Sequence, residues 1–222
     1  MLGAVLVPGY LGSRLVSARD GRLVWGSVPA LYRRRLDLLS LSSGEPLAPA
    51  GVLRRMAWND FYGRLRRTLV GRCGLVPGRT YFEYAHDWRI CHAGQGARFA
   101  RFLASLPEGR YAVIAHSTGG YLLDWALRYG EAGLEGPDPA APPPAAARVG
   151  AVVYAGCPFL GTAAASRDLV RGWTAGILDR GIPPATIRTF PSIYQAIPEL
   201  LAGRAEVRAA SARRRQSASR PA

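Results

Sequence analysis

Four short apolar runs stand out along the chain, and segments of mixed apolar and polar residues separate them. The runs cover residues 4–7, 80–84, 111–115 and 149–155. Continuous apolar character over so short a length is typical of strands buried on both faces of a parallel sheet. Because such strands alternate here with segments of helical period, the pattern predicts a three-layer α/β fold with a parallel sheet in the middle.

Several of the intervening segments predict helices. Residues 52–70 repeat apolar residues at intervals of three or four, the pattern of an amphipathic helix packed on a sheet. Further helices are predicted over residues 97–106 and from the turn at Ser117 through Leu127. Residues 136–147 contain five prolines and predict a surface loop instead.

Length and composition predict one domain. The 222 residues, 49% of them hydrophobic, are enough for a sizeable globular core. From residue 202 onward the chain turns to alanine, arginine and serine with no apolar period, which predicts a disordered tail. The α/β domain is therefore expected to cover residues 1–201, and the tail residues 202–222.

The charge and the cysteines predict neither a nucleic-acid partner nor a metal site. The net charge of +14 comes from arginine alone, because the chain contains no lysine. The arginines are scattered and no nucleic-acid module accompanies them, so no nucleic-acid partner is predicted, although the excess allows peripheral contact with anionic lipid surfaces. Cys73, Cys91 and Cys157 lack the paired spacing of a zinc site, so neither a metal nor a cofactor is predicted.

Two features of the sequence bear on its location. The apolar run at the N-terminus stops at Pro8-Gly9, which predicts a strand and not a signal peptide. No apolar run approaches the ~18 residues that a membrane-spanning helix needs. A cytoplasmic protein is expected.

The segment over residues 111–120 (YAVIAHSTGG) predicts the chemistry. A buried strand runs into a serine turn and then into a helix, as in a nucleophile elbow, where the residues two before and two after the serine must be small. Ala115 and Gly119 meet that requirement, although Ala115 departs from the usual GxSxG pattern. Ser117 is therefore the candidate nucleophile, the alternative being an ordinary polar residue at a tight turn.

A serine nucleophile also needs hydrogen-bond donors for the negative oxygen that forms during attack. The amide of Thr118, at the start of the helix, is one candidate. The segment over residues 7–13 (VPGYLGS) ends an earlier strand and offers the amide of Tyr10 as the second. These two amides are the predicted oxyanion hole.

Six segments together resemble the lecithin:cholesterol acyltransferase-like family of α/β-hydrolases, in the family's order. They are residues 7–15 (VPGYLGSRL), 20–25 (DGRLVW), 84–89 (YAHDWR), 115–120 (AHSTGG), 156–163 (GCPFLGTA) and 190–198 (FPSIYQAIP). The resemblance implies a lipid O-acyltransferase or a lipase or esterase that acts through a serine acyl-enzyme on a lipid or other ester. It also implies that Trp25 belongs to a lid over the acyl site, while a packed core tryptophan is the alternative. Residues 87–89 are expected to be structural.

One requirement of the family is missing. Its members supply the triad acid and histidine from loops after the serine, whereas His86, His92 and His116 all precede Ser117. The position of His86 and His92 beside residues 87–89 argues against either as the base. The sequence therefore predicts an α/β-hydrolase domain truncated before its last strands, with turnover near background. The alternative is an inactive scaffold that binds lipid or a partner.

Overall fold

A computed structural model of the protein describes residues 2–32, 36–132, 142–174 and 181–198. Its central sheet has four parallel strands in the order β7-β1-β8-β9. These strands are β1 (Leu2–Val7), β7 (Tyr81–Glu83), β8 (Arg110–His116) and β9 (Val149–Ala155). Val5 lies opposite Val113, which in turn lies opposite Val152. The four predicted strands and the α/β fold with a parallel sheet are confirmed.

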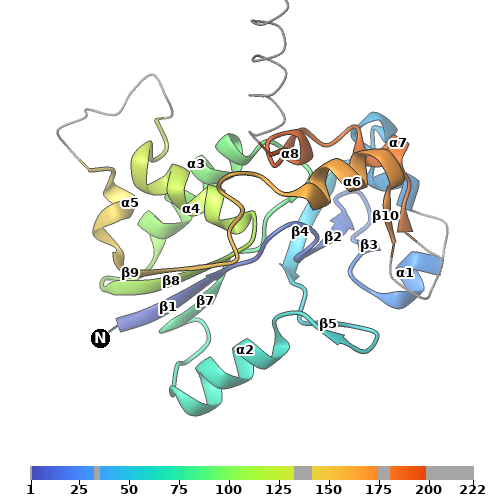
Figure 1. Ribbon diagram of the computed structural model, residues 1–222. Helices are drawn as coiled ribbons and strands as arrows, with labels where there is room; N and C mark the ends of the chain where they lie inside the picture. Colours follow the sequence, from blue (N-terminus) through green and yellow to red (C-terminus); the bar gives the residue numbers. More distant parts are fainter. Residues whose placement is uncertain (1, 33–35, 133–141, 175–180, 199–222) are drawn as a thin grey trace, which may run out of the picture.

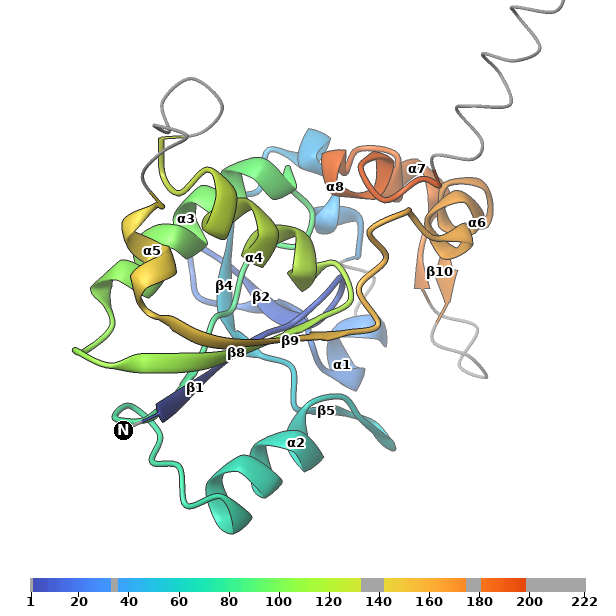
Figure 2. The ribbon, with the colours of Figure 1, turned by 60° about the vertical axis from the view of Figure 1, so that its left-hand side comes forward.

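Helices cover both faces of this sheet (Figure 1). One face carries α3 (His92–Ser105), α4 (Gly119–Arg128) and α5 (Pro144–Ala147). The other face carries α2 (Gly63–Arg67), continued by the π-helical turn η3 (Thr68–Arg72). Figure 2 shows the sheet between these two layers. Buried residues on the two sides form separate cores, one around Val7, Phe99 and Leu122, the other around Leu6 and Tyr81.

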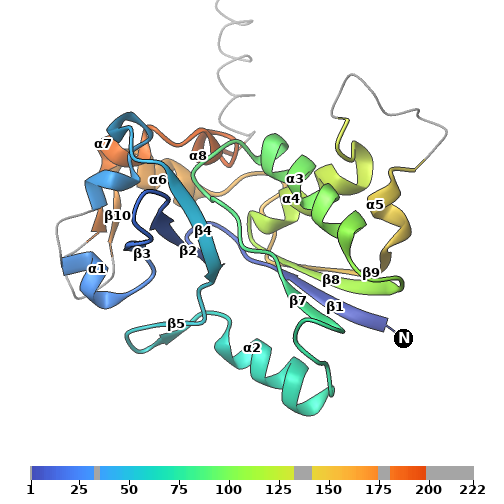
Figure 3. The same cartoon turned by 180° about the vertical axis from the view of Figure 1, so that it is seen from behind.

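A second group of elements continues from the carboxyl end of β1 and encloses a third core. Its antiparallel sheet has the order β3-β2-β4, seen from behind in Figure 3. The group consists of β2 (Ser13–Ser17), β3 (Leu23–Trp25), α1 (Val28–Tyr32), η1 (Leu36–Leu39), η2 (Leu41–Ser43), β4 (Leu47–Val52), α6 (Ala163–Arg171), β10 (Trp173–Thr174), β11 (Gly181–Ile182), α7 (Pro184–Ile187) and α8 (Pro191–Tyr194). Residues far apart in sequence, such as Leu15 and Phe190, meet in its core.

The prediction of one helix over residues 52–70 is wrong. Its first residue, Val52, is the last residue of β4. The residues that follow form a hairpin of β5 (Arg55–Met56) and β6 (Asn59–Asp60), and a helix begins only at Gly63. Ala57 has a left-handed φ of 54° at the hairpin turn, and the Asp60 carboxylate accepts the Arg64 amide at 2.8 Å. These local features stop any helix from starting earlier.

The other helix predictions are partly right. α4 is confirmed, and α3 begins at His92, ahead of the predicted residue 97. The proline-rich loop prediction is wrong over α5, where Pro144 occupies the first helical position and needs no amide donor there. Residues 136–141 of the predicted loop, and the predicted tail over residues 202–222, lie outside the described residues. No helix in the described ranges is both long and apolar enough to cross a membrane.

The junction between β1 and α4 leaves no room for a side chain at Gly119. A Cβ built there would lie 2.6 Å from the Pro8 carbonyl oxygen and 2.7 Å from that of Val7. We expect Gly119→Ala to lower the free energy of unfolding by about 1–3 kcal/mol, because backbone atoms must shift. Gly94→Ala, in open space on α3, should instead be neutral or stabilising by up to about 1 kcal/mol. Urea unfolding of both variants checks this, and equal stability would contradict the packing described.

Candidate active site

Ser117 lies on the sharp turn between β8 and α4. Its φ of 53° is left-handed, a conformation that is costly for a residue with a side chain and is typical of a nucleophile elbow. Its amide donates to the carbonyl of Ala155 on β9 at 3.0 Å, and its own carbonyl accepts the amide of Gly120 at 3.0 Å. The strand, serine and helix thus lie as the sequence predicted.

The turn after β1 packs directly against this serine. A Cβ built on Gly9 would lie 2.6 Å from the Ser117 Cβ, 3.1 Å from its Oγ and 2.9 Å from the His116 carbonyl oxygen. Glycine at this position therefore brings the backbone that leads to Tyr10 close to Ser117. The two segments singled out in the sequence meet in space.

The candidate oxyanion donors have no other use in the described part of the chain. There, the amides of Tyr10 and Thr118 donate to no backbone or side-chain acceptor. Thr118 is the residue that precedes the first turn of α4, where helix amides are unpaired. Both amides remain candidates to hold a negative oxygen.

A cavity of about 160 Å³ opens beside Ser117. Tyr10, Ser117 and Thr118 line it together, as the predicted site requires. Two further lining residues, His92 and Asp168, were not predicted to lie here. The structure therefore adds an imidazole and a carboxylate to the walls of the serine cavity.

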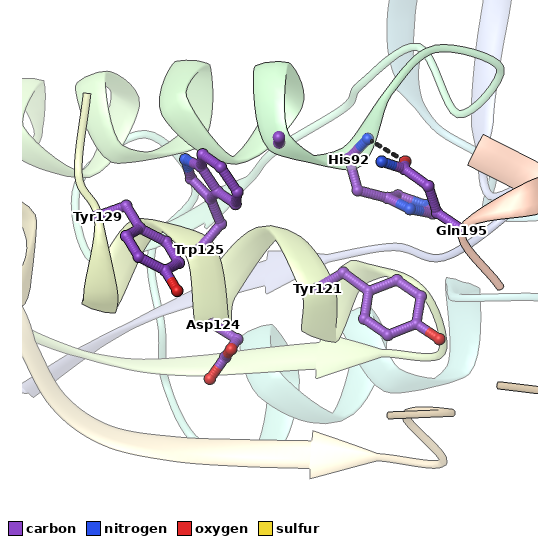
Figure 4. Close-up of a pocket in the computed structure, with 7 residues that line it drawn as sticks. His92, Tyr121, Asp124, Trp125, Tyr129 and Gln195 are labelled. Carbon is purple, nitrogen blue, oxygen red and sulfur yellow. Dashed lines mark hydrogen bonds between the residues drawn. The ribbon is translucent and has the colours of Figure 1, made fainter. Parts of the chain in front are cut away.

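His92 reaches the cavity from the first residue of α3. The sequence argued against it as a base because it lies beside the structural residues 87–89, whereas the structure places it in the wall of the serine cavity. Its amide donates to Oε1 of Gln195 at 2.8 Å (Figure 4). One signal could have found it: a residue that follows a parallel strand lies at the same sheet edge as the residues that follow its neighbours.

Burial changes the acid–base properties of the cavity walls. It lowers the pKa of His92 to about 4 and that of the nearby His86 to about 3, so both imidazoles are neutral at neutral pH. Burial also raises the pKa of the Asp168 carboxyl, although Arg167 donates two hydrogen bonds to Oδ1. Burial, and then the charge of Asp168, raise the pKa of the Tyr10 hydroxyl.

His116 is adjacent to Ser117 but is occupied elsewhere. The Gly9 amide donates to the Tyr62 hydroxyl at 3.0 Å, and that hydroxyl lies 2.8 Å from Nδ1 of His116. The Tyr62 hydroxyl therefore links Gly9 to His116, whichever of the two groups donates in the second bond. His116 therefore helps to hold the turn after β1 against the elbow, and it does not line the cavity.

Trp25 and residues 87–89 lie in the protein interior. The Trp25 side chain is fully buried, donates to the carbonyl of Leu11 at 2.9 Å and packs edge-on against Trp88 and Trp173. These contacts are those of a core tryptophan, the alternative that the sequence left open. Arg89 binds both carboxylate oxygens of Asp87 at 2.9 and 2.8 Å, which confirms the structural role predicted for this segment.

Comparison with known proteins supports the fold. No family model and no curated protein matches the chain. Among solved structures, a chain in the crystal structure of the Tle4–Tli4 complex is similar, with a TM-score of 0.55 and 14% sequence identity. The match covers 89% of this protein and 54% of that chain, so this protein spans about half of the length of its structural neighbour. The likeness concerns the fold.

The buried neutral histidines predict acid sensitivity. Their pKa values are lower in the folded than in the unfolded state, so unfolding takes up protons and stability falls as the pH drops from 6.5 toward about 4. Each such histidine contributes a slope of up to about 1.4 kcal/mol per pH unit. We expect His86→Gln to reduce the pH dependence of the free energy of unfolding between pH 6 and 5 by up to about 1.4 kcal/mol per pH unit. Identical slopes in urea titrations of the two proteins would contradict the burial of a neutral His86.

Proposed function

We propose that this protein transfers acyl groups from lipid or other esters through a Ser117 acyl-enzyme, as a lipase or esterase or as an O-acyltransferase. The observation that carries the proposal is the left-handed turn at Ser117, with the turn after β1 packed against it. A strained serine between a parallel strand and a helix, beside unpaired amides, is the arrangement that acyl-transfer chemistry uses.

The chemistry follows from these atoms. The Ser117 Oγ attacks the ester carbonyl carbon, and the amides of Tyr10 and Thr118 donate to the carbonyl oxygen as it becomes negative. The alcohol leaves, and water or a second alcohol then takes the acyl group from the serine. A base must accept the serine proton for either half of the reaction to proceed at a useful rate.

Apolar side chains near the cavity support a lipid substrate. Phe159 is 45% and Leu160 73% exposed, and they follow Pro158, which lines the cavity. Such exposed apolar groups favour contact with an acyl chain or a lipid surface. The net charge of +14 favours anionic surfaces in particular.

A non-catalytic scaffold is the second candidate. No histidine follows Ser117 in the chain, and the outer residues of β9, including Val152, Val153 and Tyr154, are exposed. In the described residues β9 pairs with β8 alone, and an open strand edge is a template for pairing with another chain. The neighbour in the Tle4–Tli4 structure is itself part of a complex, which is consistent with a protein partner.

Covalent labelling separates the two candidates. We expect a lipophilic fluorophosphonate to label the protein once, at Ser117. Ser117→Ala should abolish both the label and any hydrolysis of p-nitrophenyl acyl esters, because no other group replaces the nucleophile. Ser105→Ala, an exposed serine at the end of α3, is the matched control and should keep both. Mass spectrometry of the labelled peptide checks the position. A wild-type protein that is folded but is not labelled by the fluorophosphonate would favour the non-catalytic scaffold.

A further inference from the structure

We propose that His92 is the general base that takes the proton from Ser117. This inference rests on the proposed function and supplies the group that the sequence left missing. It places the base on α3, before the nucleophile in the chain, in the wall of the cavity that Ser117 also lines.

The position of His92 is fixed while one ring nitrogen is left unused. The side chain is buried, with 7% of its surface exposed, and its backbone is tied to Gln195. Its ring centroid lies 4.9 Å from that of Tyr121 on α4. Figure 4 draws the two side chains together. In the described structure its Nδ1 has no hydrogen-bond partner. A buried polar atom without a partner is costly, so this nitrogen, in a residue that lines the same cavity as Ser117, calls for an explanation.

The other two histidines do not fit the role. His86 is buried and lies outside the cavity lining, with both ring nitrogens unpartnered in the described structure. His116 gives its Nδ1 to Tyr62 and is absent from the cavity wall. Of the three histidines in the chain, all of them described, His92 alone shares a cavity with Ser117.

Burial keeps His92 neutral. The neighbouring ionisable groups are His86, the Cys91 thiol on the preceding residue and the Tyr121 hydroxyl on α4, while Asp168 lines the same cavity from α6. Burial is the largest influence and lowers the pKa of His92 to about 4, while a side-chain hydrogen bond with Gln195 acts in the opposite direction. The ring is therefore neutral from pH 5 to 8, with one nitrogen that carries no proton, as a general base requires before it accepts one.

The reaction balances with the ester and water as its only reactants. The Ser117 Oγ forms a bond to the ester carbonyl carbon while its proton moves to a nitrogen of His92. The tetrahedral intermediate then collapses, the bond to the alcohol oxygen breaks, and the imidazolium returns the proton to the departing alcohol. Water repeats the sequence and releases the acid, leaving Ser117 and His92 as they began.

The test compares Ser117-dependent hydrolysis of p-nitrophenyl esters in wild type, His92→Gln and His92→Asn, with His86→Gln as the matched control for loss of a buried imidazole. Because a general base contributes about 10²–10⁴-fold, we expect kcat/KM to fall by at least about 100-fold in both His92 variants and by only a few-fold in His86→Gln. Thermal unfolding establishes that each variant is folded.

Two further readouts exclude a merely structural role. The wild-type kcat/KM should stay level from pH 8 to 5 and fall only near pH 4, where His92 becomes protonated. Added imidazole should restore part of the activity of His92→Gly, because it can occupy the vacated space and accept the proton. These measurements keep the test decisive even if the Gln and Asn variants are unstable.

The outcomes separate this inference from the proposed function. Ser117-dependent turnover that persists in folded His92→Gln, with its acid limb unchanged, would overturn His92 as the base and leave the serine mechanism in place. A wild-type protein without Ser117 labelling and without Ser117-dependent turnover would overturn both.

Discussion

The close packing of the β1 turn against the Ser117 elbow is the constraint on which the rest of the site depends. A left-handed serine costs about 1–3 kcal/mol and persists only where the surroundings fix it. Here the surroundings are the turn after β1, since a Cβ at Gly9 would lie 2.6 Å from the Ser117 Cβ, and one at Gly119 would lie 2.6 Å from the Pro8 carbonyl oxygen. The bonds from Gly9 to Tyr62 and from Tyr62 to His116 tie the same turn to the residue before the serine. The same packing therefore accounts for the left-handed backbone of Ser117 and for the position of the Tyr10 backbone near it.

Parallel strands explain how distant residues reach this constraint. The carboxyl ends of β1, β7 and β8 meet at one edge of the sheet, and the chain leaves that edge toward Tyr10, His92 and Ser117 in turn. Ligand sites of open α/β sheets lie at this edge for the same reason. The elements of the third core then cover the edge, and α6 contributes Asp168 to the cavity. Topology assembles the site, and local packing sets its geometry.

The sequence predicted those features that depend on neighbouring residues and failed on those that depend on distant contacts. The strands were predictable because each apolar run is buried where it stands, and the Ser117 turn because its small neighbours are adjacent in the chain. The helix over residues 52–70 failed because its apolar residues serve separate cores: Met56 joins the third core, while Leu65 packs beneath the sheet. The place of His92 was not predictable because a contact with Gln195, 103 residues away, helps to hold it in the cavity wall.

A crystal structure of the protein after reaction with a fluorophosphonate tests the central claim most directly, because the phosphonyl oxygen stands in for the negative oxygen of the transition state. The account predicts a phosphorus bonded to the Ser117 Oγ, with its oxygen about 2.7–3.1 Å from the amides of both Tyr10 and Thr118. An adduct on another residue, or a phosphonyl oxygen directed away from these two amides, would contradict it.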